Sequence, residues 1–125
     1  MLGWLNDVAR AIQKLRDQGS QRIWLVGSTT GGSLAIMAAA RDPEIRGVAV
    51  MAPRADFDDW ASDPRRFLQH CRNVGVIDDE DYPVSVSQWS NELRQNRAID
   101  SVKDMGSRPL LILHGTNDRQ VPSDD

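Results

Sequence analysis

The stretch Arg22-Ile-Trp-Leu-Val-Gly-Ser-Thr-Thr-Gly-Gly-Ser-Leu-Ala-Ile-Met-Ala-Ala-Ala-Arg41 decides the fold of this chain of 125 residues. Residues 23–26 are an apolar run without polar alternation, which is typical of a parallel strand covered on both faces. Gly27 ends the run, and Gly31 and Gly32 open a helix whose alanines are small enough for close packing on a sheet. The stretch therefore predicts a buried strand, a tight turn and a helix.

The turn between this strand and helix has the glycine spacing of a nucleophile elbow, Gly-x-Ser-x-Gly. In that motif the flanking residues must be small because the turn is strained, and the central side chain stands above the sheet. The five residues here are Gly27-Ser-Thr-Thr-Gly31, which puts Thr29 in the nucleophile position. Ser28 lies one position early and is expected to point away from the Thr29 side chain. Thr29 is therefore the candidate nucleophile.

A glycine-rich turn before a helix can also hold a phosphate, because unpaired backbone N–H groups and the positive end of the helix dipole face an anion. The details of this turn do not fit that use. No lysine follows the glycines as it does in a P-loop, and Thr29 stands where the second glycine of Gly-x-Gly-x-x-Gly would be. A nucleotide-binding α/β domain is therefore the weaker alternative.

The chain on either side continues an α/β pattern. Apolar residues at helical spacing predict an amphipathic helix over residues 2–18, with Gly19 as its C-cap. Apolar runs at residues 47–52 and 109–114 predict two more buried strands. Helices that alternate with strands indicate right-handed parallel crossovers. The expected fold class is α/β, with parallel strands and flanking helices in a single domain.

Residues 54–108 have a different composition. Charged residues, tryptophans and prolines alternate there, and no apolar run predicts a strand. So long a connection inside a compact domain is usually functional or independently folded. Short helices are predicted in it at residues 55–60, 64–71, 86–93 and 100–105. We interpret this segment as a small helical cap followed by a connecting helix.

Composition excludes several classes of partner. A net charge of −3 gives no electrostatic footprint for nucleic acid or for an anionic membrane surface. The single cysteine, Cys71, excludes an internal disulfide and is expected to be a small buried hydrophobe, and no secretory signal is recognisable. We therefore expect a cytoplasmic protein.

The acidic run at residues 78–81 lacks the ligand spacing of a calcium loop, and neither a metal nor a cofactor is expected.

Three stretches together resemble the α/β-hydrolase superfamily, of the bacterial serine-hydrolase type with a helical cap. They are residues 25–35 as the elbow strand and helix, residues 47–53 as the next strand, and residues 109–122 as the strand that bears the catalytic acid. The last of them carries the run His114-Gly-Thr-Asn-Asp-Arg-Gln-Val-Pro122. The resemblance spans nearly the whole chain, but only the central part of the family's fold, from the elbow to the acid strand.

This resemblance implies an enzyme that cleaves an ester, an amide or a related acyl bond in a small-molecule substrate. Asp118 matches the aspartate that orients the catalytic histidine in the family. Thr29 matches the nucleophile, and the N–H of Thr30 matches half of the oxyanion hole.

The chain departs from the family at two places. The family's nucleophile is usually serine, whereas Thr29 is β-branched in a turn that needs positive φ. No histidine follows Asp118, and the two present are expected to have other roles: His114 as a structural part of its turn and His70 as a surface or packing residue. A truncated or inactive hydrolase and a non-catalytic binding protein are both compatible with these departures.

The strand at residues 23–26 is expected to have an unpaired side. A flat apolar edge of that kind invites pairing with another chain. The sequence therefore predicts self-association through an exposed sheet edge.

Overall fold

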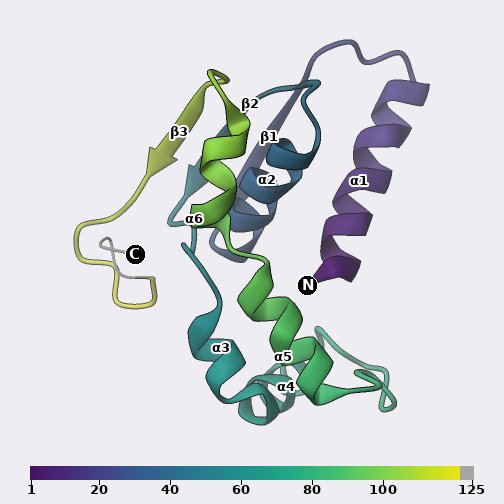
Figure 1. The fold of residues 1–125 in the computed structure, drawn as a ribbon, viewed down its shortest axis with the longest axis vertical. Coiled ribbons are helices and arrows are strands. Elements are labelled where there is room, and N and C mark those ends of the chain that lie inside the picture. The colour runs from purple at the N-terminus through teal and green to yellow at the C-terminus, as the bar shows by residue number, and fades with distance from the viewer. Residues whose placement is uncertain (122–125) are drawn as a thin grey trace. The chain divides into compact units, whose positions relative to one another are not determined.

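A computed structural model describes residues 1–121, which form two compact units (Figure 1). The sheet unit contains residues 2–56 and, of the later chain, residues 97–121. The helical unit contains Met1 and residues 57–96. The chain therefore leaves the sheet unit after Asp56 and returns to it at Arg97.

The sheet unit is a mixed α/β structure around three parallel strands. Its strands occur in the order β1-β2-β3, and both neighbouring pairs are parallel. The mixed α/β class and the three parallel strands predicted from the sequence are confirmed. In chain order the elements are α1 (Leu2–Asp17), β1 (Ile23–Ser28), α2 (Thr30–Arg41), β2 (Ile45–Met51), α6 (Ala98–Ser101), the 3-10 helix η1 (Val102–Met105) and β3 (Leu110–Leu113).

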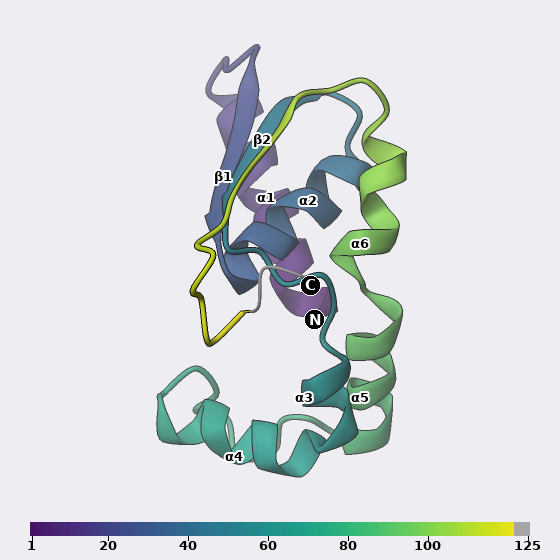
Figure 2. The same ribbon diagram turned by 90° about the vertical axis from the view of Figure 1, so that its left-hand side faces the viewer.

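The helices of this unit lie on one side of the sheet (Figure 2). Helix α2 packs directly on β1 and β2, and α1, α6 and η1 pack on α2. The strand order explains this arrangement, because successive right-handed crossovers that advance in one direction leave their helices on one face. The core lies between that face and α2, and its most deeply buried side chains are Ile36, Met37, Ala39, Ile45, Val48 and Val50.

The opposite face of the sheet is open. Trp24 and Val26 of β1 are 57% and 71% exposed, and Leu111 and Leu113 of β3 are more than half exposed. The expectation that β1 is covered on both faces is therefore wrong, and so is the expectation that β3 is a buried strand. Apolar composition predicted the strands correctly but did not show which of their faces a helix would cover.

Arg108 links two segments of the sheet unit by donating hydrogen bonds to their backbone carbonyl groups. Its guanidinium donates to the carbonyl oxygens of Ala39, Asp42 and Ile45, at 2.8, 2.9 and 3.2 Å. It also donates to the carbonyl of Met105 at 2.8 Å. The bonds to Ala39 and Asp42 lie at the C-terminus of α2, where the last carbonyl groups have no full set of helical partners. A single side chain thus ties the α2–β2 connection to the segment before β3.

The helical unit contains α3 (Asp58–Ser62), α4 (Pro64–Asn73) and α5 (Val86–Gln95), which fall where the sequence predicted short helices. Side chains at two N-caps fix where these helices begin: the Asp63 carboxylate accepts from the Arg66 N–H, and the Ser85 hydroxyl accepts from the Gln88 N–H. Cys71 is 3% exposed, as predicted.

Stacked aromatic rings hold this unit together. The ring centroids of Trp60 and Phe67 are 4.0 Å apart, and Trp89 stacks on the other side of Phe67 at 5.4 Å. Phe57, which is fully buried, contacts Trp60 at 5.0 Å. Large rings provide most of the apolar area that three short helices can bury.

Candidate functional site

Thr29 occupies the turn between β1 and α2 in a strained backbone conformation. Its φ of 45° and ψ of −121° lie where L-residues are rare and β-branched residues are outliers. The Thr29 N–H donates to the Met51 carbonyl at 2.9 Å, which ties the turn to the end of β2. Thr29 itself is exposed. The positive φ that a nucleophile elbow requires at this position is therefore confirmed.

Only one of the two glycines that flank the elbow is sterically required. A Cβ atom on Gly27 would lie 2.3 Å from the carbonyl oxygen of Gly31 and 2.6 Å from the nitrogen of Gly32, so no larger residue fits. A Cβ atom on Gly31 would meet nothing within 4 Å. The expectation that both flanking residues must be small is therefore wrong for Gly31, whose backbone makes the close approach while its own Cβ position faces open space.

Ser33 fixes the first turn of α2 to the chain that follows β2. Its buried hydroxyl donates to the Arg54 carbonyl at 2.7 Å and accepts from the Arg54 N–H at 3.0 Å. The Ser33 N–H donates to the Thr29 carbonyl at 3.1 Å. Ser33 thereby connects the elbow to the exit of β2. Sequence reasoning missed this residue, because a serine within a helical pattern carries no signal of a distant partner.

The exit of β2 repeats the construction of the exit of β1. Ala52 directly follows the strand with a φ of 44°, and its N–H donates to the Leu113 carbonyl at 2.8 Å. Within residues 1–121, Thr29 and Ala52 are the non-glycine residues with positive φ. Strained residues cluster at functional sites, so both point to the edge at which the three strands end. We call it the carboxyl edge; Ser28, Met51 and Leu113 are its last strand residues.

Asp118 lies in the turn that follows β3 and is held by backbone N–H groups. Its Oδ1 accepts from the N–H of Gln120 at 2.8 Å and from the N–H of Val121 at 3.0 Å. These two hydrogen bonds, with Val121 contributing more, hold the pKa of the Asp118 carboxyl below its usual value. The carboxylate is therefore charged at neutral pH and fixed in orientation.

His114 is a structural part of the same turn, as the sequence predicted. Its Nε2 lies 2.8 Å from the Val121 carbonyl oxygen and 4.0 Å from Oδ2 of Asp118. The bond to Val121 spans the loop between the end of β3 and residue 121. Within residues 1–121 no hydrogen bond joins either histidine to the Thr29 hydroxyl, and His70 is an exposed residue of α4 in the helical unit.

The strand register brings the predicted site residues to the carboxyl edge. Ser28 pairs with Met51, and Met51 pairs with Leu113, so the exits of β1 and β3 flank the exit of β2. At the usual strand spacing these two exits are about 10 Å apart. Thr29 directly follows Ser28, whereas Asp118 lies further along the turn that begins after Leu113. The Thr30 N–H is in the first turn of α2, where N–H groups have no helical partner. Open parallel sheets bind ligands at this edge.

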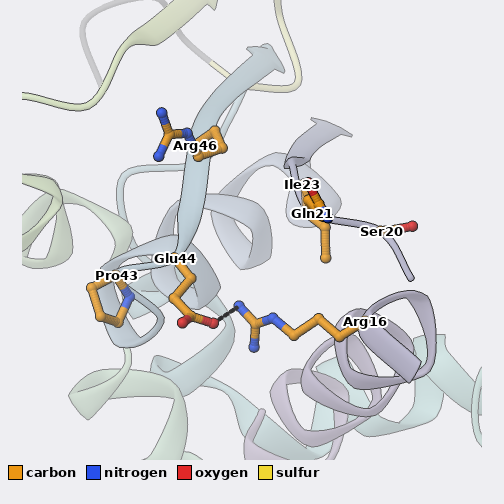
Figure 3. Close-up of a pocket in the computed structure, with 7 residues that line it drawn as sticks. All are labelled: Arg16, Ser20, Gln21, Ile23, Pro43, Glu44 and Arg46. Carbon is orange, nitrogen blue, oxygen red and sulfur yellow. Dashed lines mark ion pairs between the residues drawn. The ribbon is translucent and has the colours of Figure 1, made fainter. Parts of the chain in front are cut away.

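The other end of the strands carries a pocket of about 500 Å³ (Figure 3). Arg16 lines it and pairs with Asp42 at 2.9 Å and with Glu44 at 3.1 Å. The Arg16 hydrogen bond is the main reason that the pKa of Asp42 is lowered. Asp42 and Glu44 therefore already neutralise Arg16, one of the two arginines that line this pocket. The strained residues Thr29 and Ala52 lie at the carboxyl edge, which is therefore the better candidate site.

Within residues 1–121, no group of three or more His, Cys, Asp and Glu side chains is placed to hold a metal ion. In the same part of the chain, no helix combines the length and the apolar composition needed to cross a bilayer. Comparison with protein-family models and with curated proteins gives no match for this sequence. The function of the carboxyl edge is therefore inferred from its own geometry and from the motifs in the sequence.

Proposed function

We propose that the carboxyl edge is an acyl-transfer site of the α/β-hydrolase kind, suited to an ester, an amide or a related acyl bond. The observation that supports this most directly is the backbone of Thr29, whose positive φ is kept although the residue is β-branched. Strain of this kind costs about 1–3 kcal/mol and persists where the surrounding structure enforces it. Gly27, the bond to Met51 and the bonds of Ser33 are what enforce it here.

The proposed chemistry assigns one role to each part of the edge. The Thr29 hydroxyl attacks the acyl carbon and passes its proton to a base, while the Thr30 N–H donates to the oxygen that becomes negative. The base returns the proton to the alcohol or amine that departs as the ester or amide bond breaks, and water then releases the acid from Thr29. Asp118 orients a histidine that acts as the base. Since no hydrogen bond within residues 1–121 joins either histidine to the Thr29 hydroxyl, we expect the chain alone not to hydrolyse activated esters above background.

A phosphonylating probe with added imidazole tests this proposal without requiring turnover. Imidazole in solution replaces the base, and a fluorophosphonate forms a stable adduct that mass spectrometry can map to one residue. We expect Thr29→Ser to be modified at residue 29 at least about tenfold faster than the wild type, because serine lacks the methyl group that adds strain and crowds attack. Thr29→Ala should give no adduct there.

Ser28→Ala is the matched control, because Ser28 is the neighbouring exposed hydroxyl and ends β1. The Ser28→Ala variant should be labelled at residue 29 at the same rate as the wild type. An adduct mapped to Ser28, or a folded Thr29→Ser protein that stays unlabelled at saturating imidazole, would contradict the assignment of Thr29 as the nucleophile.

The second candidate function is a non-catalytic protein that binds a small apolar molecule or another protein. The β-branched residue at the nucleophile position favours it, because the extra methyl group hinders attack on a carbonyl. A folded but unreactive Thr29→Ser protein would support this alternative. The role of the helical unit as a cap and a cytoplasmic location are proposals that rest on the sequence alone.

A further inference from the structure

The open face of the sheet is mostly apolar. Val26, Ala49 and Leu111 are partners across the three strands, and the next row of the same face is Ser28, Met51 and Leu113. Trp24 lies across Gly47 at the start of the face, since a Cβ atom on Gly47 would meet the indole ring at 2.3 Å and Pro109 at 2.9 Å. We define the open face by its most exposed members, Trp24, Val26, Met51, Leu111 and Leu113.

This face is exposed for a topological reason and not because of a local irregularity. The helices of the sheet unit, α1, α2, α6 and η1, lie on the opposite side of the sheet (Figure 2). Parallel sheets are normally covered on both faces, and their strands are apolar on both sides for that reason. The strands of this unit have that composition, so the open face has the chemistry of a surface that is covered in the functional protein.

We propose that a second copy of the chain covers it, with the two open faces packed against each other about a two-fold axis. The five side chains that define the face are all apolar, so a symmetric pair places apolar groups against each other. Five side chains of 45–71% exposure supply on the order of 500 Å² per copy, and thus about 1,000 Å² in a pair. That area is at the lower limit for a specific interface, so the dimer is weak.

The geometry is that of two aligned sheets about 10 Å apart, as in a β-sandwich. A two-fold contact uses the same surface on both copies and closes after two of them, so assembly stops at the dimer. This contact differs from pairing along the unpaired edge of β1, which would use backbone groups and leave the open face exposed.

Sedimentation of the full chain over a range of concentrations tests the proposal. The wild-type mass should rise from the 14.0 kDa of one chain toward twice that value as the concentration approaches about 200 µM. Val26→Lys puts a charge on β1 within the open face and should weaken association at least about tenfold. Leu113→Lys, on β3, should act in the same direction.

Val84→Lys is the matched control, because Val84 is a fully exposed valine of the helical unit. It should associate like the wild type, and circular dichroism should show that all three variants are folded. A wild type that stays monomeric at the highest concentration overturns the proposal. Association that Val26→Lys and Leu113→Lys leave unchanged also overturns it, and assigns the contact to the β1 edge or to the helical unit.

Discussion

The sheet unit and the helical unit are held together in different ways. In the sheet unit the decisive contacts involve the backbone: Gly27 against Gly31, Ser33 to Arg54, and Arg108 to a set of carbonyl oxygens. In the helical unit they are contacts between aromatic rings. Backbone contacts fix positions closely and tolerate no added atom, whereas ring stacks tolerate exchange among apolar side chains of similar size. The candidate site lies in the unit whose positions are fixed more closely.

The largest expected effect comes from one methyl group in the elbow. Gly27→Ala places Cβ 2.3 Å from a backbone oxygen that cannot move without breaking the β1–α2 turn. We expect a loss of more than about 3 kcal/mol in the free energy of unfolding, measured by urea denaturation followed by circular dichroism.

Gly31→Ala is the control within the same motif. Its Cβ meets nothing within 4 Å, and alanine is the better helix former, so stability should be unchanged or rise by up to about 1 kcal/mol. Equal losses in the two variants would show that the turn, and not the close approach at Gly27, limits both positions.

A smaller effect, confined to the helical unit, is expected from Phe67→Ala. Phe67 stacks between Trp60 and Trp89, and its removal should destabilise this unit by about 3 kcal/mol. The alkylation rate of Cys71 measures this loss of stability. Burial shields the Cys71 thiol and raises its pKa, so the thiol is alkylated slowly until the helical unit opens. The alkylation rate should rise about 100-fold.

Val84→Ala should leave the alkylation rate unchanged, because Val84 is fully exposed. Amide hydrogen exchange in β2 should also stay as in the wild type when Phe67 is replaced. If exchange in β2 increases as much as Cys71 alkylation, the two units unfold as one and the contrast between them fails.

Local patterns in the sequence were sufficient to predict the strands and the strained turn at Thr29. Apolar runs located the three strands, and the spacing of Gly27 and Gly31 located the strained residue, because both signals depend on neighbours in the chain. The open face could not be predicted in this way. Trp24 and Val26 are as apolar as buried strand residues, and their exposure depends on the direction in which the crossovers advance.

The long-range contacts of single polar residues could not be predicted from the sequence either. Arg108 precedes a proline in a polar segment and carries no mark of the carbonyls that it binds more than 60 residues earlier in the chain. Ser33 likewise gives no sign of Arg54. Such partners are set by tertiary packing, which brings together segments whose sequences do not signal each other.

The smallest expected effect concerns the charge of Asp118 in the turn after β3. The N–H groups of Val121 and Gln120 favour the charged carboxylate, so the pKa of Asp118 in the folded chain is below its value in the unfolded chain. A lowered pKa contributes stability at pH values above the unfolded pKa of about 3.9, and this contribution is lost as the pH falls through the folded value. Titration of the Asp118 carboxyl carbon by NMR should therefore have its midpoint below that of a peptide with the sequence of residues 114–121. Asp118→Asn keeps an acceptor oxygen for both N–H groups but removes the titrating carboxyl. In this variant the protection of the Val121 amide against hydrogen exchange should no longer weaken at low pH. A midpoint at or above that of the peptide would show that the turn does not hold the carboxylate as described, and would remove the support that its fixed orientation gives to a catalytic role.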